Sequence, residues 1–243
     1  MAKSLNGAVA LVTGASSGIG AATARHLARE GAAVALVARR RDRLDQVVGD
    51  ITGPAGHAVA VAADITDPEQ AERAVEQTLD RFGRLDVLVN NAGLMLLGTA
   101  LHAMIEEWDR MISLNVSALL HVTHAAVPHL IDAASTSPRQ VADIVNVSST
   151  AGRVARPGGS VYHFTKFGLN GFTDSLRQEL LGERVRVSVV EPGTVDTDLV
   201  GRPLGGIEAL RAEDIADAIG YIVSRERRVA VNEMLVRAAE QTW

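Results

Sequence analysis

The chain has 243 residues, a formal net charge of −5 and no cysteine. An acidic balance argues against a general binder of nucleic acid or of anionic membranes. Without cysteine there are no disulfide bonds and no thiolate metal sites, and we predict no metal site of any kind. Hydrophobic residues make up 47% of the chain but aromatic residues only 3%, so a core of aliphatic side chains is expected.

The chain shows no sign of targeting or of several domains. Residues 1–7 lack the charged and apolar regions of a secretory signal. No uninterrupted apolar run approaches the ~18 residues of a membrane span. We therefore expect a cytoplasmic protein that does not bind membranes. The polar stretch 135–140 is interpreted as a surface loop, so residues 1–243 form a single predicted domain.

The first elements are a strand, a glycine-rich turn and a helix, predicted at Ala8–Val12, residues 13–20 and Ala21–Glu30. Glycines let the backbone turn tightly and let a pyrophosphate approach the main chain, and the helix N-terminus adds free N–H groups. The turn therefore predicts a phosphate cradle. Its spacing is Gly-x-x-x-Gly-x-Gly and not the commoner Gly-x-Gly-x-x-Gly. The alternative interpretation is a Gly/Ser turn without a ligand.

A second apolar strand, Ala33–Ala38, runs into the basic cluster Arg39–Arg43. Dinucleotide folds that prefer NAD often carry an acidic residue here for the ribose 2′-OH. An arginine instead pairs with a 2′-phosphate, which a carboxylate would repel. Ala38 followed by Arg39 and Arg40 thus favours NADP over NAD. The alternatives are a solvated charge run at a helix start or, less compatible with an acidic chain, a nucleic-acid contact.

The rest of the chain alternates helices and strands with short connections. Helices are predicted at 42–51, 66–82, 104–134, 160–182 and 212–224, and strands at 57–62, 86–89, 143–148, 185–190 and 233–236. This alternation predicts an α/β fold, a doubly wound parallel sheet with helices on both faces. The helix 104–134 is apolar on several faces, so it requires more than one packing partner, and another subunit is one candidate.

Tyr162 and Lys166 lie four residues apart in the helix predicted at 160–182. Positions i and i+4 share a helix face, so the phenol and the ammonium point the same way. A fixed cation favours the phenolate and lowers its pKa, and such a phenol can exchange a proton with a substrate oxygen. The alternative is an ordinary helix surface.

Six motifs in order resemble the short-chain dehydrogenase/reductase family in its single-domain form. They are Thr13-Gly14-x-x-x-Gly18-x-Gly20, Asn90-Asn91-Ala92-Gly93, Asn115, Ser149, Tyr162-x-x-x-Lys166 and Pro192-Gly193. The resemblance extends over essentially the whole chain. It implies a Rossmann fold with one nicotinamide dinucleotide and a small-molecule substrate, and a homo-oligomer, either a tetramer or a dimer.

The resemblance also implies catalytic roles. Tyr162 would be the general acid/base, and Lys166 would lower its pKa and hold the nicotinamide ribose. Ser149, thirteen residues before the tyrosine and preferred over Ser148, would bind the substrate carbonyl. Asn115 would bend its helix and hold a water in a proton relay.

Cofactor contacts are implied along the whole chain. Asp64 and Ile65 would flank the adenine, Asn91 would brace the sheet, and Ser17 stands where NADP-preferring members often have a basic residue. The full implied set is Gly14, Ser16, Ser17, Gly18, Ile19, Gly20, Arg39, Arg40, Asp64, Ile65, Asn91, Ala92, Gly93, Tyr162, Lys166, Pro192, Gly193, Val195 and Thr197.

The expected activity is NADPH-dependent reduction of an aldehyde or ketone to an alcohol, with Tyr162 as the general acid. Residues 194–211 would form a substrate lid, and residues 94–98, 149–154 and Leu199 would line the pocket. The first two of these pocket stretches are similar to bacterial reductases of the clavaldehyde dehydrogenase type. Two alternatives remain open: an NAD-dependent alcohol dehydrogenase of the same fold, and a catalytically silent nucleotide-binding scaffold.

Overall fold

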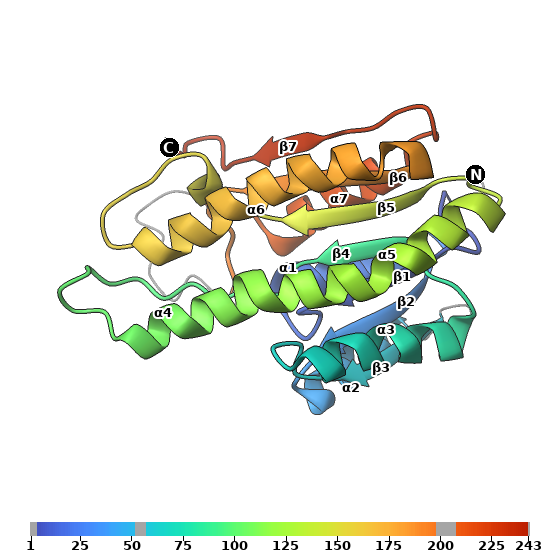
Figure 1. Cartoon of the computed structure of the whole chain (residues 1–243), viewed down its shortest axis with the longest axis horizontal. Coiled ribbons are helices and arrows are strands. Elements are labelled where there is room, and N and C mark those ends of the chain that lie inside the picture. Colours follow the sequence, from blue (N-terminus) through green and yellow to red (C-terminus); the bar gives the residue numbers. More distant parts are fainter. Residues whose placement is uncertain (1–3, 52–56, 198–207, 243) are drawn as a thin grey trace.

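A seven-stranded parallel sheet forms the middle layer of the molecule (Figure 1). The computed structural model describes residues 4–51, 57–197 and 208–242. The sheet order is β3-β2-β1-β4-β5-β6-β7. The strands are β1 (Val9–Thr13), β2 (Ala33–Ala38), β3 (Ala58–Ala62), β4 (Val87–Asn90), β5 (Ala142–Val147), β6 (Val185–Pro192) and β7 (Glu233–Val236).

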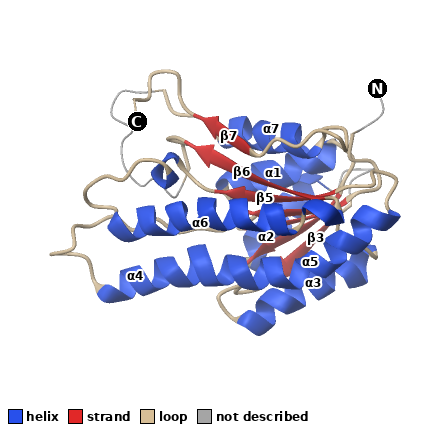
Figure 2. Cartoon of the chain, turned by 45° about the horizontal axis from the view of Figure 1, so that its top comes forward, coloured by secondary structure: helices blue, strands red, loops and turns tan. Residues whose placement is uncertain are grey.

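Helices cover both faces of the sheet, as Figure 2 shows from a second direction. One face packs against α1 (Gly18–Arg29), α2 (Arg41–Ile51) and α7 (Ala212–Val223). The other packs against α3 (Pro68–Phe82), α5 (Leu119–Thr136) and α6 (Ser160–Glu179). Each interface is filled by Ala, Val, Leu and Ile. The predicted doubly wound fold with an aliphatic core is therefore confirmed.

The strand order reverses between β1 and β4, which are neighbours in the sheet. Parallel α/β sheets bind ligands at such a switch point, in the crevice beyond the carboxyl ends of the strands. Gly14 directly follows β1 and Asn91 directly follows β4. Two of the sequence motifs therefore meet at this edge.

The glycine turn after β1 is shaped by close backbone contacts. Gly14 has φ 66°, and a Cβ there would lie 2.9 Å from the Ala92 Cα. A Cβ on Gly20 would collide with the carbonyl oxygen of Gly14. A side chain at either position would push the turn away from β4, so these positions require glycine.

The helix predicted at 104–134 is continuous but not uniform. It consists of α4 (Ile105–Ile112), a π-helical segment Ser113–Ala118 and α5, which extends to Thr136. The first two residues of the predicted 135–140 loop are thus helical. The Ser135 and Thr136 hydroxyls bond to the Asp132 carbonyl oxygen, which stabilises this extra turn. The π segment contains Asn115 and widens the helix at that point.

Several boundaries differ from the prediction, and α1 begins at Gly18, three residues before its predicted start. Strand β6 continues to Pro192 because its last residues pair with β7, Pro192 lying beside Val236. Helix α6 ends at Glu179, and a short 3₁₀ turn follows at Leu181–Glu183.

Within the described residues, one helical stretch, Ile105–Thr136, is long and apolar enough to cross a membrane by length and composition alone. Polar residues such as Asn115 and Thr123 interrupt this stretch, so it contains no long uninterrupted apolar run. Core helices of water-soluble proteins pass the same test, and Val122, Ala126 and Leu130 of this stretch are buried against the sheet.

Candidate active site

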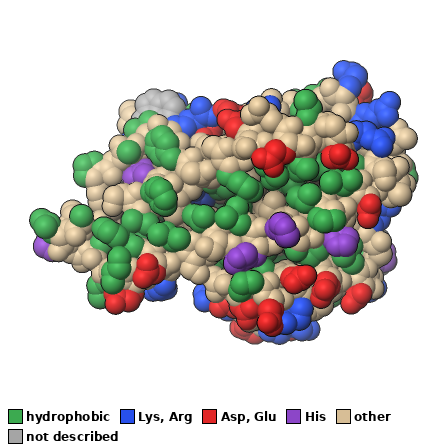
Figure 3. All heavy atoms as spheres, in the orientation of Figure 1, with side chains coloured by type: hydrophobic (Ala, Val, Ile, Leu, Met, Phe, Trp, Pro, Cys, Tyr) green, Lys and Arg blue, Asp and Glu red, His purple; other side chains and the backbone are tan. Residues whose placement is uncertain are grey.

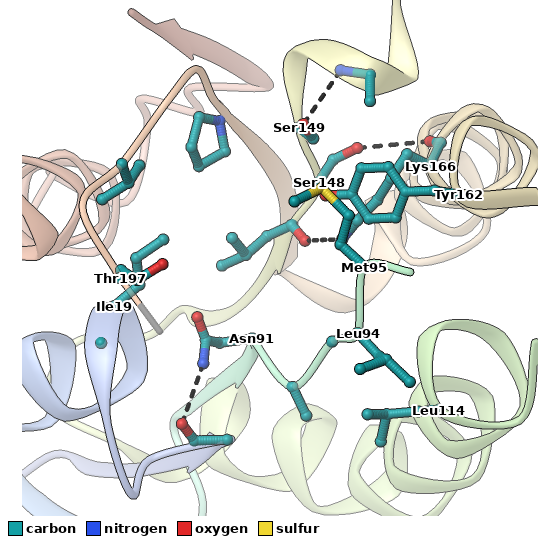
Figure 4. Close-up of a pocket in the computed structure, with 18 of the residues that line it drawn as sticks. Ile19, Asn91, Leu94, Met95, Leu114, Ser148, Ser149, Tyr162, Lys166 and Thr197 are labelled. Carbon is teal, nitrogen blue, oxygen red and sulfur yellow. Dashed lines mark hydrogen bonds between the residues drawn. The ribbon is translucent and has the colours of Figure 1, made fainter. Parts of the chain in front are cut away.

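A cavity of about 850 Å³ lies at the carboxyl edge of the sheet (Figure 4). Its walls come from the turn after β1, the ends of β2 to β6, the start of α6 and the segment 192–197. At one end are the glycine turn and the arginines after β2, and at the other are Ser149 and Tyr162.

The basic residues at the end of β2 are arranged differently from one another. The Arg40 guanidinium donates hydrogen bonds to the Ser16 and Ser17 hydroxyls at 3.0 and 3.1 Å. The Arg39 guanidinium lies 4.0 Å from Asp64 and is largely exposed. Arg40 therefore contacts the glycine turn, whereas Arg39 reaches toward β3. The sequence predicted a 2′-phosphate contact for both arginines and did not distinguish between them.

Asn91 fastens β4 to β1 beneath the cavity. Its backbone N–H donates to the Thr13 hydroxyl at 3.0 Å, and its side-chain amide donates to the Thr13 carbonyl at 2.9 Å. These bonds fix the separation between the two strand ends that form the switch point. They correspond to the bracing role expected from the sequence.

Tyr162 and Lys166 both point from α6 into the cavity (Figure 4). The Lys166 Nζ lies 5.9 Å from the centre of the Tyr162 ring and donates to the Val147 carbonyl at 2.9 Å. The Ser149 hydroxyl accepts from the Ala151 N–H at 3.1 Å, and its interaction with the Tyr162 phenol lowers the pKa of that phenol. The hydroxyl of the neighbouring Ser148 instead donates to the Lys166 carbonyl at 3.4 Å. Of the two serines, Ser149 is thus the one directed at the phenol.

The pKa of Tyr162 moves in the opposite direction from the sequence expectation. Burial raises the pKa of this phenol, and the hydrogen bond with Ser149 offsets part of the increase. The Lys166 ammonium is buried too, and desolvation lowers its pKa to about 8. In each case the cause is desolvation, which penalises the charged form of the group. The phenol is therefore a protonated group, suited to donate its proton.

We predict that Lys166 titrates near pH 8 in the folded protein. The sequence contains only two lysines, Lys3 and Lys166, so NMR of protein labelled with ¹³C-lysine gives two Cε signals to follow. A folded pKa of about 8, below the ordinary 10.5, means that folding disfavours the charged form. This cost is fully present below pH 8 and is lost as pH rises from 8 to 10.5, so stability increases across that window.

The Lys166→Met variant identifies the shifted signal, because that signal must disappear. Two signals that both titrate near the ordinary lysine value would show that burial does not perturb Lys166.

Asn115 is buried in the π segment and holds the loop after β4. Its side-chain amide donates to the Leu94 carbonyl at 2.8 Å, and its oxygen accepts from the Leu94 N–H at 2.7 Å. A Cβ on Gly93 would lie 3.6 Å from the Asn115 oxygen and 3.9 Å from the Lys166 Nζ. Asn115 thus stands next to the lysine end of the site.

Most sequence-predicted residues lie together on this cavity. Of the predicted catalytic and cofactor-binding residues, Gly20 and Asn115 do not line it, because Gly20 packs behind the turn and Asn115 behind the 94–98 loop. Of the predicted pocket stretches, four residues do not line it: Leu96, Gly98, Gly152 and Arg153. Part of the predicted lid, residues 198–207 with Leu199, lies outside the described residues. Val195 and Leu210, at its two ends, form an isolated bridge.

A buried carboxylate beside the site was missed by the sequence interpretation. Glu191, at the end of β6, is fully buried and accepts from Arg153 at 2.6 Å and from Asn170 at 2.7 Å. Arg153 also pairs with Glu233 on β7. The group ties the turn after Ser149 to α6, β6 and β7. No local pattern signals it, since its members come from four separate segments.

Several cavity-lining residues were also missed. They include Arg110, Ser113, Leu114, Arg156, Pro157, Gly159, His163 and Gln241. They belong to segments that the fold brings to the site, including the C-terminal tail, where the Gln241 side chain accepts from the Thr194 N–H at 2.8 Å.

Comparison with known proteins places this site in a family. Residues 8–203 match the family model described as short chain dehydrogenase. An uncharacterized oxidoreductase of Staphylococcus epidermidis is 36% identical over 230 residues, which is 94% of this chain and 96% of that protein.

Two solved structures share the architecture. A 3-ketoacyl-(acyl-carrier-protein) reductase from Brucella melitensis, complexed with NADH, has a TM-score of 0.87 and 33% identity, covering 96% of this chain and 97% of that one. A metagenomic short-chain oxidoreductase in complex with NADP has a TM-score of 0.83 and 36% identity, covering 96% and 98%.

The chain therefore belongs to the short-chain dehydrogenase family. It is an oxidoreductase of this family, with a nicotinamide dinucleotide as its cofactor. The cavity fits such a ligand. Gly14 and Gly18 have positive φ and leave the turn open where a side chain would stand, and the cavity continues from this turn to Tyr162.

Proposed function

We propose that the protein reduces an aldehyde or ketone to an alcohol with NADPH, and that Tyr162 is the general acid. The observation that carries this proposal is the buried phenol of Tyr162, which lines the cavity together with Ser149 and Lys166. A buried phenol keeps its proton at neutral pH and can donate it to a substrate oxygen, as reduction requires.

In this proposal Ser149 and Tyr162 donate hydrogen bonds to the substrate carbonyl oxygen. As negative charge develops on that oxygen, both bonds strengthen, and Tyr162 delivers its proton. The bound dinucleotide supplies the hydride. Lys166 holds the nicotinamide ribose and, because its pKa is about 8, carries most of its charge at neutral pH. Asn115 keeps the 94–98 loop in place beside them.

We further propose NADP(H), rather than NAD(H), as the cofactor. The end of β2 offers Ala38 and no carboxylate, and Arg39 and Arg40 both line the cavity. The Arg40 guanidinium and the Ser16 and Ser17 hydroxyls form one cluster of hydrogen-bond donors beside the phosphate-binding turn. A 2′-phosphate accepts bonds from all three groups. The NADP complex of the metagenomic relative supports this choice.

The narrower likeness to reductases of the clavaldehyde dehydrogenase type is part of the same proposal. Of the two stretches that carry it, Leu94, Met95 and Leu97 line the cavity, as do Ser149, Thr150, Ala151 and Val154. These side chains favour a substrate whose carbonyl sits on a mainly apolar body.

A panel of aldehydes and ketones, assayed with NADPH and with NADH at the nicotinamide absorbance, tests the proposal. We expect carbonyl reduction with a higher kcat/KM for NADPH. Oxidation of alcohols with NAD⁺ as the dominant activity would favour the alternative dehydrogenase. Tight dinucleotide binding without any turnover would favour a silent scaffold.

We propose that the protein is a homo-oligomer assembled through the α5–α6 face, which we define by Leu120, Phe164 and Phe167. These side chains are 40%, 65% and 44% exposed. The sphere view of this side shows hydrophobic side chains gathered over α5 and α6 (Figure 3). Burying such side chains between two copies contributes roughly 25 cal/mol per Å² of apolar surface.

We predict that light scattering at micromolar concentration gives a mass at least twice the 25.7 kDa of one chain. Phe167→Glu should lower that mass, because a charge in the contact is costly to bury. Leu181→Glu is the matched control, since Leu181 is also exposed but lies in the turn after α6. A single-chain mass for the unmodified protein would contradict assembly.

A further inference from the structure

The catalytic end of the cavity carries two arginines that the proposed reaction does not use. Arg110, on α4, and Arg156, in the loop between Ser149 and Tyr162, both line the cavity. Among the described residues, neither guanidinium has a hydrogen bond or an ion pair. By contrast, the nearby Arg153 is engaged by Glu191 and Glu233.

The charge balance of the cavity is one-sided. Of its described lining residues, Asp64 is the sole carboxylate, and it lies at the opposite end beside Arg39. The catalytic end combines Arg110 and Arg156 with the buried Lys166. The cavity therefore attracts anions at the end where the substrate binds.

Arg156 is held in place by a specific contact. The His163 ring donates from Nδ1 to the Ala151 carbonyl, at 2.9 Å, and its Nε2 accepts from the Arg156 N–H, at 3.1 Å. The ring thus bridges the start of the loop to its middle. A second bond, from the Gly98 N–H to the Gly158 carbonyl at 2.8 Å, ties the same loop to the 94–98 loop. The backbone that carries Arg156 is therefore anchored to His163 on α6, the residue that follows Tyr162.

The lining of the same cavity also includes the apolar side chains of Leu94, Leu97 and Val154. A substrate that places its carbonyl at Tyr162 and an anion at Arg156 would carry a hydrocarbon spacer between the two groups. A carboxylate suits the site, because a guanidinium donates two parallel hydrogen bonds to it.

We infer that the substrate is an oxo acid, a carbonyl compound whose carboxylate is bound by Arg156 with Arg110 as its second cation. This inference rests on the proposed carbonyl reduction and names its substrate class. The carbonyl carbon gains a hydride from NADPH, the carbonyl oxygen gains the Tyr162 proton, and NADPH becomes NADP⁺. The carboxylate is unchanged and serves as the anchor.

The test compares succinate semialdehyde and glutarate semialdehyde with their methyl esters, which keep the aldehyde and remove the charge. One or two charged hydrogen bonds predict a kcat/KM for the better acid about ten- to hundred-fold above that of its ester. Arg156→Met should bring this ratio of acid to ester toward one. The double variant, with Arg156→Met and Arg110→Met, should remove the remaining preference for the acid. Arg81→Met, which removes an arginine on α3, is the control for net charge and should keep the ratio.

A binding measurement makes the test independent of turnover. Calorimetry of the protein loaded with NADP⁺ should show 4-hydroxybutanoate binding more tightly than its methyl ester, and Arg156→Met should remove the difference. If acids and esters had equal kcat/KM values and equal affinities, the oxo-acid inference would be overturned and the proposed carbonyl reduction would stand. Preferential binding of the acid without reduction of any carbonyl compound would keep the anionic subsite and overturn the proposed reaction.

Discussion

Tyr162→Phe is expected to lower kcat by about 10²–10⁴-fold, the usual contribution of one positioned proton-transfer group. The phenyl ring keeps the packing of the buried side chain, so only the hydroxyl and its bond with Ser149 are lost. Dinucleotide affinity should change little, because the glycine turn and the residues after β2 are untouched. Single-turnover kinetics and fluorescence titration with NADPH separate these two effects.

Tyr221→Phe is the matched control for this variant. Tyr221 is the only other tyrosine in the sequence, lies on α7 and is half exposed beside Arg225. Its replacement should leave kcat within a factor of two or so. If Tyr162→Phe retained turnover near that of the unmodified protein, the proton would have to come from another group, and the proposed role of Tyr162 would be wrong.

Ala38→Asp is expected to reverse the preference between NADPH and NADH. Hydrogen bonds to a charged group contribute roughly 1.5–3 kcal/mol each, so the arginines give NADPH about a ten- to hundred-fold advantage. An aspartate at the end of β2 would repel the 2′-phosphate and accept a bond from the free 2′-OH of NADH. Because the arginines are exposed, the advantage of NADPH in the unmodified protein should also shrink as salt is added.

Ala38→Asn controls for side-chain size without charge and should shift the ratio of kcat/KM values much less. The separate variants Arg39→Ala and Arg40→Ala measure how much each arginine contributes to the preference for NADPH. The hydrogen bonds from Arg40 to Ser16 and Ser17 predict that Arg40 contributes more than Arg39. An unchanged cofactor ratio in Ala38→Asp would mean that residue 38 does not face the ribose.

Local sequence patterns were sufficient for the fold and for the position of the site. Strands such as Ala33–Ala38 are short apolar runs, and helices such as the one with Tyr162 and Lys166 have recognisable periods. In a parallel sheet all strand ends lie at one edge, so residues that follow strands meet there. The glycine turn and Asn91 could be placed together for that reason alone, and the helix period put Tyr162 and Lys166 on one face.

The tertiary structure decided what depends on burial and on contacts between distant segments. Burial, not the neighbouring charge, sets the direction of the Tyr162 pKa, and no sequence pattern reports how deeply a side chain is desolvated. Asn115 in the π-helical segment is bonded to Leu94, a contact between distant segments that no local pattern reports. The exposed pair Arg110 and Arg156 became a feature of the site because folding brings α4 beside α6. The sequence determined which functional groups the site contains. The packing determined how deeply Tyr162 and Lys166 are buried and which charged side chains line the cavity with them.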